Sequence, residues 1–114
     1  MKFQFDCVFY YVTDIERAIS FYSDILDLKP TSRDVVVRFD IDGVLFELVP
    51  ASGETKLQGG GNARLCLKVD NIHQALKELQ TKGIHTSHVQ EVDNGMFASF
   101  EDPDGNEICL WQYR

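Results

Sequence analysis

The chain has 114 residues, of which 44% are hydrophobic and 25% charged, and its formal net charge is −7. This length predicts one domain with a core of its own, and no apolar run approaches the ~18 residues that a membrane-spanning helix needs. The acidic balance argues against nucleic acid as a partner and favours a cationic ligand over an anionic one. Three cysteines at wide spacing, an odd number, predict free thiols in a cytoplasmic protein.

The first half of the chain predicts a strand, a helix and three further strands. Asp14 stands where a helix N-cap belongs, and apolar residues recur at helical spacing after it. Pro30 and the polar residues that follow predict a short edge strand, and Asp42-Gly43 is a two-residue hairpin signal. The predicted elements are a strand over 5–12, a helix over 15–26, the edge strand, and strands over 35–40 and 44–49.

The second half predicts the same order after a glycine-rich stretch. A Gly-Gly-Gly run at 59–61 within the apolar-poor segment 51–62 predicts a flexible linker. Asn71 stands where a second helix would be capped, and Asp102-Pro103-Asp104-Gly105 has the residues of a tight turn. The predicted elements are a strand over 64–69, a helix from 72 to about 83, and strands over 84–92, 96–101 and 106–113.

Two segments of the chain occur twice. Val12-Thr13-Asp14-Ile15 returns as Val69-Asp70-Asn71-Ile72, and the stretch 40–48 returns with changes as 102–110. Two copies of one small unit, neither able to bury its apolar face alone, are stabilised by packing together. The sequence therefore predicts one α+β domain over 1–114.

This domain would consist of module one (1–50), a linker (51–62) and module two (63–114). In each module, the chain would run from a strand through a helical crossover into a meander of strands. This order places the helix on one face of the sheet and leaves the opposite face of the sheet uncovered. We expect two βαβββ modules to form one curled mixed sheet, a cup with the helices on its outer face. Alternation along the strands assigns the inward-facing residues. These are Cys7, Phe9 and Tyr11; Arg64, Cys66 and Lys68; Leu45, Glu47 and Val49; and Glu107, Cys109, Trp111 and Tyr113.

Three parts of the sequence resemble a known family. Val12–Ala18, Phe21–Leu28 and Asp102–Asn106 are similar to the vicinal oxygen chelate superfamily, which includes glyoxalase I, bleomycin resistance proteins and extradiol dioxygenases. The resemblance covers essentially the whole chain. It implies the two-module fold and a homodimer, but no particular reaction.

In the metal-dependent members, a His or Glu on the first and last strand of each module converges on one divalent ion. The resemblance places Cys7, Glu47, Arg64 and Cys109 at these positions, so only Glu47 is a usual ligand. Arginine is a permanent cation without an acceptor atom, and we therefore expect no metal and no other cofactor. A zinc site of Cys7, Glu47 and Cys109, with Cys66 as a further ligand, is the alternative to simple packing of these cysteines.

Glu47 and Arg64 have two interpretations. In the favoured one they face each other and neutralise one another in a partly dry cavity. In the other, Arg64 holds a ligand carboxylate and Glu47 accepts a proton, as the corresponding glutamates do in the catalytic members. Glu47 is thus the candidate catalytic residue. The candidate ligand-binding set is Cys7, Phe9, Tyr11, Glu47, Arg64, Cys66, Cys109 and Trp111.

Three functions follow from these residues. The favoured one is a glyoxalase/bleomycin resistance-like protein that binds a small aromatic or cationic molecule in the cup without a metal. The wall of that cup would consist of Phe9, Tyr11, Trp111 and Tyr113. The second is a lyase, isomerase or dioxygenase with a remodelled metal site or metal-independent acid-base chemistry through Glu47. The third is a dimeric scaffold. The expected partners are a small molecule and a second copy of the chain, with neither nucleic acid nor a membrane.

Overall fold

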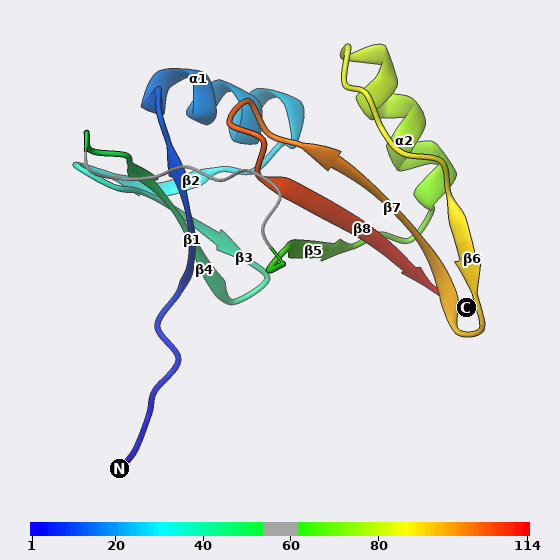
Figure 1. Ribbon diagram of the computed structural model, residues 1–114, viewed down its shortest axis with the longest axis horizontal. Coiled ribbons are helices and arrows are strands. Elements are labelled where there is room, and N and C mark those ends of the chain that lie inside the picture. The colour runs from blue at the N-terminus through cyan, green and yellow to red at the C-terminus, as the bar shows by residue number, and fades with distance from the viewer. Residues whose placement is uncertain (54–61) are drawn as a thin grey trace. The chain divides into compact units, whose positions relative to one another are not determined.

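A computed structural model describes residues 1–53 and 62–114, so the predicted linker lies outside the described residues over 54–61. The chain divides into two compact units, Met1–Leu57 and Gln58–Arg114, and each holds a strand, a helical segment and three strands (Figure 1). The first unit contains β1 (Val8–Val12), α1 (Ile15–Ile19), the π-helix η1 (Ser20–Ile25), β2 (Pro30–Arg33), β3 (Val37–Ile41) and β4 (Val44–Pro50). The second contains β5 (Leu65–Lys68), α2 (Ile72–Thr81), β6 (Gln90–Val92), β7 (Gly95–Glu101) and β8 (Glu107–Tyr113).

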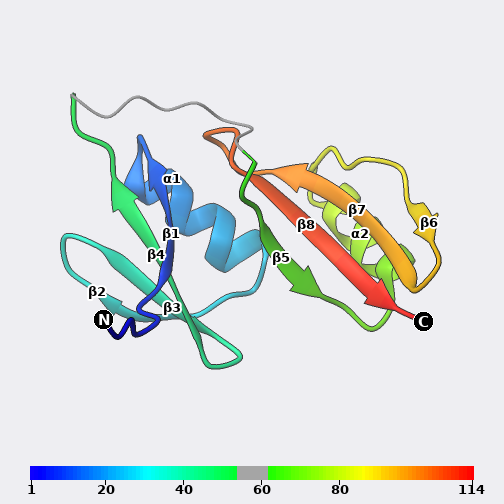
Figure 2. The same ribbon diagram turned by 60° about the horizontal axis from the view of Figure 1, so that its bottom comes forward.

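Each unit forms a four-stranded mixed sheet. The strand orders are β1-β4-β3-β2 and β5-β8-β7-β6, with the first strand of each unit parallel to its last and the remaining pairs antiparallel. A helical crossover makes this parallel pairing possible, and Figures 1 and 2 show the helix of each unit over one face of its own sheet. The predicted α+β class is confirmed, and the module duplication is visible in the fold.

The core of module one lies between the helical segment and the covered face of its sheet. Tyr22, Phe39 and Phe46 are fully buried, and the Tyr22 ring lies 5.2 Å from that of Phe46 and 6.2 Å from that of Phe39. Burying a side chain of this size stabilises the fold by roughly 2–3 kcal/mol. The aromatic cluster therefore fixes the helix on one face and leaves the opposite face for other contacts.

The first helix has the predicted extent but changes type along its length. Asp14 caps it, accepting a hydrogen bond from the Arg17 amide at 3.1 Å. From Ser20 the chain forms a π-helix, whose wider turn rotates adjacent side chains by a smaller angle than an α-helix does. Adjacent Phe21 and Tyr22 can therefore both point into the core, where they are 4% and 0% exposed. An α-helical period does not predict this change.

Helix α2 follows the prediction closely. Asn71 caps it by accepting from the Gln74 amide at 3.1 Å, and the helix ends before Gly83, which has a positive φ of 85°. The Ile72 amide also donates to Oε1 of Gln112 at 2.8 Å, which ties the helix start to β8. No helix in the described part of the chain is long and apolar enough to cross a membrane. The buried side chains of α2 are Ile72, Leu76 and Leu79.

Both predicted turns are confirmed. Asp42 and Gly43 have φ values of 53° and 87°, as a hairpin turn of mirror type requires. In the second turn, Asp102 is buried and its carboxylate accepts hydrogen bonds from the amides of Asp104 and Asn106, both at 2.9 Å. These contacts fix the register of the strands on either side of each turn.

Two predicted strands are too long. The strand expected over 5–12 starts at Val8, the first residue with a register partner in β4, which is Phe46. The strand expected over 84–92 forms only over Gln90–Val92. Here the Ser87 hydroxyl, and not a backbone carbonyl, accepts from the Ser99 amide at 2.8 Å, which interrupts the ladder.

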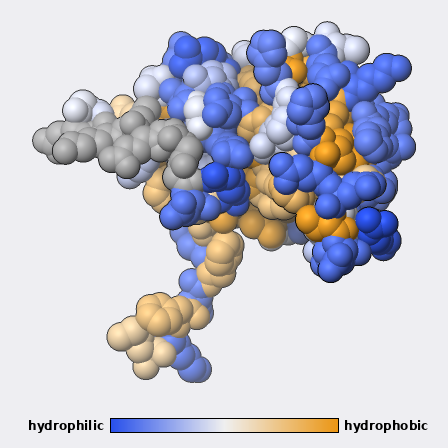
Figure 3. Space-filling model, turned by 45° about the vertical axis from the view of Figure 1, so that its right-hand side comes forward, coloured by the Kyte–Doolittle hydropathy of each residue, from blue (hydrophilic) through white to orange (hydrophobic). Residues whose placement is uncertain are grey.

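The residues before β1 form an N-terminal arm, Met1–Asp6. Its apolar side chains alternate with polar ones, and Met1, Phe3 and Phe5 are exposed by 105%, 87% and 74%. Figure 1 shows the chain before β1 extending away from the sheet of its own module, and Figure 3 shows apolar side chains at the end of this arm. Such consecutive exposure of large apolar groups is unusual on a soluble surface.

Candidate functional site

The free face of each sheet, opposite its helix, carries the predicted site residues. In module one, Phe9 pairs with Glu47 and Tyr11 with Val49 between the parallel strands β1 and β4. Phe9 and Tyr11 are 44% and 41% exposed, whereas Val12, which points to the helix, is fully buried. The rings of Phe9 and Tyr11 meet edge to face at 5.2 Å. The alternation predicted for this strand is therefore confirmed.

Glu47 is held by an arginine of its own module. Nε of Arg38 donates to Oε2 of Glu47 at 3.1 Å, and the Glu47 side chain is 15% exposed. The partner favoured from the sequence is Arg64, whereas the structure places Arg38 beside Glu47. Counting back from the Asp42-Gly43 turn pairs residue 38 with residue 47, so the hairpin itself contained the signal for this contact.

The half-buried Cys7 thiol lies close to Glu47 at the start of the same face. Burial, followed by the negative charges of Glu47 and Asp6, raises the pKa of this thiol above its ordinary value of 9.0. The thiol is therefore protonated at neutral pH, and a protonated thiol is a poor nucleophile and metal ligand. Module one thus offers a carboxylate paired with a guanidinium, beside an unreactive thiol.

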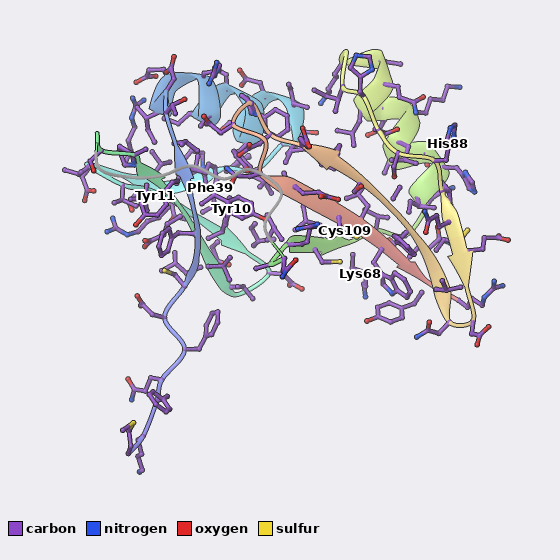
Figure 4. All side chains as sticks on the ribbon, in the orientation of Figure 1. Tyr10, Tyr11, Phe39, Lys68, His88 and Cys109 are labelled. Carbon is purple, nitrogen blue, oxygen red and sulfur yellow. The ribbon has the colours of Figure 1, made fainter. Side chains whose placement is uncertain are left out.

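In module two the free face combines thiols, a cation and aromatic rings. Cys66 pairs with Cys109 and Lys68 with Trp111 between the parallel strands β5 and β8. Residues in register on neighbouring strands point to the same face, and Figure 4 shows Lys68 and Cys109 on the side of the sheet away from α2. Ile108 and Leu110, which alternate with Cys109, are buried under α2.

Three aromatic side chains form a wall on this face. The Trp111 ring stacks on Phe97 at 6.2 Å and 23°, and it meets Tyr113 edge to face at 5.4 Å. Phe97 was missed from the sequence, although its register with Trp111 puts it on the same face. Among the described residues, the buried Nε1 of Trp111 has no hydrogen-bond partner. We call Phe97, Trp111 and Tyr113 the aromatic wall.

Arg64 is paired within module two. Its guanidinium lies 3.1 Å from the Glu107 carboxylate, and the two side chains are 34% and 27% exposed. Exposed pairs of this kind contribute about 1 kcal/mol or less. The positive charge of Arg64 thus has a carboxylate of its own module beside it.

Cys66 and Cys109 are register partners on β5 and β8, so their thiols lie side by side on the free face. Burial and the adjacent Cys66 thiol raise the pKa of Cys109 from 9.0 to about 11, against a smaller opposing effect of Arg64. Cys66 is exposed and Cys109 half-buried. The pair is therefore accessible, with both sulfurs on one face.

The residues at the family's ligand positions do not fit its divalent ion. Arg64 has no lone pair to donate, Glu47 is bound by Arg38, and the pKa of the Cys7 thiol is raised by its burial and by Glu47. In the part of the chain that the structure describes, no three His, Cys, Asp or Glu residues gather as a metal site would require. The zinc alternative gains no support from this arrangement.

Module two also has a hollow that the sequence did not indicate. Its volume is about 480 Å³, and it is lined by residues 83–85 and 87 after α2, by the end of β7, and by Asp102 and Glu107. Of the described residues that line it, none belongs to the predicted ligand-binding set. The buried carboxylate of Asp102 in this hollow accepts hydrogen bonds from the amides of the turn before β8, so it stabilises the turn.

The sequence profile of the Glyoxalase/Bleomycin resistance protein/Dioxygenase superfamily matches residues 4–110. Among solved structures, the chain is similar to TnmS3, an antibiotic binding protein from Streptomyces sp. CB03234, with 24% identity, a TM-score of 0.75 and 100% of both chains covered. It is also similar to the fosfomycin resistance protein FosX from Listeria monocytogenes, with 14% identity, a TM-score of 0.82 and coverage of 100% of this chain and 96% of that one.

A third similar structure is a lactoylglutathione lyase from Agrobacterium tumefaciens, with 17% identity, a TM-score of 0.77 and coverage of 96% of this chain and 92% of that one. No curated protein matches the chain. At these identities the three structures establish the fold and nothing finer.

Proposed function

The chain belongs to the Glyoxalase/Bleomycin resistance protein/Dioxygenase superfamily, and from this premise we propose that it is a binding protein that holds a small aromatic or cationic molecule without a divalent metal ion. The observation that carries the proposal is the aromatic wall on the free face of module two. One protein of the same fold, TnmS3, is an antibiotic binding protein. Binding of an antibiotic is therefore one use of this fold.

The aromatic wall suits a flat ligand for physical reasons. Phe97 and Trp111 present nearly parallel rings, and a further ring or a cation placed against such a surface gains about 0.5–2 kcal/mol beyond the area that it buries. Trp111 Nε1, without a partner among the described residues, would favour a ligand with an acceptor atom. The net charge of −7 attracts cations to the protein as a whole.

The second candidate, an enzyme of the same superfamily acting through Glu47, has weaker support. A general base must be free to take a proton, but the Glu47 carboxylate already accepts a hydrogen bond from Arg38 at 3.1 Å. The nearby Cys7 is not a ready nucleophile, because its pKa is raised. Acid-base chemistry would require the Arg38 contact to open.

We also propose that the protein is a cytoplasmic homodimer. The N-terminal arm exposes Met1, Phe3 and Phe5, and pairing with a second copy would cover these side chains. The three cysteines are free, which is typical of a reducing compartment. The homodimer and the small molecule are the partners that we propose.

Calorimetric titration of chelator-treated protein tests the binding proposal. The probes are a cationic, a neutral and an anionic polycyclic aromatic compound, and we expect the cationic one to bind most tightly. Phe97→Leu should weaken binding about fivefold, the equivalent of roughly 1 kcal/mol of stacking, whereas the control Val44→Leu in the module one hairpin should not.

Three outcomes would contradict this function. Failure of all three probes to bind would remove the case for an aromatic ligand. Turnover of a bound compound, detected by mass spectrometry and lost in Glu47→Gln, would establish the enzyme instead. Activity that appears only when a divalent ion is added would support the metal-dependent form of that enzyme.

A further inference from the structure

Cys66 and Cys109 occupy directly opposite positions on neighbouring parallel strands. They are register partners between β5 and β8, so the roughly 4.8 Å spacing of the strands separates their backbones, and both side chains leave the same face. The Cys109 thiol donates to the Leu110 carbonyl at 3.7 Å. A rigid sheet thus holds two sulfur atoms side by side.

The surroundings of this pair limit what it can bind. Cys66 is exposed, so a solute reaches the sulfurs without unfolding the sheet. The nearest carboxylate on the same strand, Glu107, is engaged by Arg64 at 3.1 Å, and no third His, Cys, Asp or Glu completes a ligand group among the described residues. Zinc normally takes four protein ligands in a structural site, and this pair supplies two.

We propose that Cys66 and Cys109 form a two-sulfur chelating site for a soft ion of low coordination number, Cu(I). Soft thiolate ligands select such ions, and two sulfurs satisfy a low-coordinate one. Binding converts two thiols and Cu(I) into a bis-thiolate copper complex with one negative charge and releases two protons. Lys68, two residues after Cys66 on the same face of β5, provides positive charge for that complex.

The proposed two-sulfur site is independent of the proposed binding of an aromatic molecule. It rests on two sulfur atoms in β5 and β8, whereas the aromatic ligand rests on the aromatic wall of β7 and β8. Of the four positions that correspond to the family's divalent-ion ligands, the chelating pair includes only Cys109. Either idea can therefore fail while the other stands.

Competition for Cu(I) in reducing, oxygen-free buffer tests the proposal, with bathocuproine disulfonate as the coloured competitor. We expect one Cu(I) per chain in the wild type and in the matched control Cys7→Ser, which removes the third thiol. Cys66→Ser and Cys109→Ser should each lower the affinity by about tenfold or more, because losing even an outer partner of a ligand costs about that much. Equal affinity in wild type and Cys66→Ser would overturn the proposal.

Phenylarsine oxide gives a second measurement on the unmutated protein. Its arsenic forms two As–S bonds with a pair of adjacent thiols and releases its oxygen as water, using both thiol protons. We expect a single stable adduct in the intact mass of the wild type and of Cys7→Ser, and none in Cys66→Ser. An absent wild-type adduct, or tight stoichiometric zinc binding by the pair, would contradict a two-ligand soft-ion site.

Discussion

Gly95 occupies a position where a side chain has no room. It begins β7 opposite Tyr113, and a Cβ built on it would lie 2.3 Å from the Gln112 carbonyl oxygen and 2.7 Å from the Trp111 ring. We therefore expect Gly95→Ala to push apart the β7 and β8 backbones or to displace Trp111. Because the nearest atom belongs to the backbone, rotation of a flexible side chain does not relieve the clash.

The expected cost follows from two opposing effects. Overpacking of a well-filled site typically costs about 1–3 kcal/mol, and replacing glycine by alanine in a strand returns about 0.5–1 kcal/mol through the unfolded chain. The contact at 2.3 Å favours the upper end of the first range, so we expect a net loss of about 1–2 kcal/mol. With a urea dependence of about 1–3 kcal/mol per molar, the unfolding midpoint should fall by roughly 1 M.

Equilibrium urea unfolding, with near-ultraviolet circular dichroism for Trp111, measures both consequences. Gly53→Ala is the matched control, because a Cβ there meets nothing within 4 Å. We expect the control to unfold at or slightly above the wild-type midpoint and to keep the Trp111 signal. Equal midpoints for Gly95→Ala and Gly53→Ala would show that Trp111 does not pack on Gly95 as described.

Three further predictions concern charge, assembly and pH. In a Cys66→Ser/Cys109→Ser background, Glu47→Gln should lower the pKa of Cys7 and so speed its alkylation by iodoacetamide at mildly alkaline pH. The control is Glu78→Gln in the same background. Equal alkylation rates in the two variants would contradict the contact between Glu47 and Cys7. Light scattering should show that the wild type is a dimer and that Phe3→Ser/Phe5→Ser is a monomer. The control Lys2→Ser/Gln4→Ser should remain a dimer. A monomeric wild type would refute the proposed dimer. The folded protein holds the Cys109 proton more tightly than the unfolded chain does, so the free energy of unfolding should fall as the pH rises from about 9 towards 11. This fall should be less steep in Cys109→Ser. Parallel plots of unfolding free energy against pH for the two proteins would contradict the raised pKa of Cys109.

Local signals in the sequence predicted the turns, caps and strand faces, because each depends on a few neighbouring residues. The Asp42-Gly43 hairpin even determines the contact between Arg38 and Glu47 by counting. Alternation likewise assigned Cys66 and Cys109 to one face. Their direct register was not predictable, because a parallel pair is joined through a helix and no turn fixes its alignment.

Other features depend on tertiary packing and left no local pattern. The π-helix at Ser20–Ile25 serves the burial of two adjacent aromatic residues against the sheet, which an α-helical period does not show. The shortness of β6 depends on one serine hydroxyl that replaces a backbone acceptor. In both features a side-chain contact, and not a local pattern, determines the backbone arrangement.

The pairing of charges within each module bears on the kind of ligand that the protein takes. Glu47 is bound by Arg38, and Arg64 by Glu107, so each module has neutralised the charged group that the family's ligand positions contain. An anionic ligand would have to compete with Glu107 for Arg64, whereas a cation or a neutral ring on the aromatic wall competes with neither pair. Arg64→Ala should therefore lower the unfolding free energy by about 1 kcal/mol or less and leave the affinity for a cationic aromatic probe nearly unchanged. A large loss of affinity in this variant, with little change in stability, would instead place Arg64 in contact with the ligand.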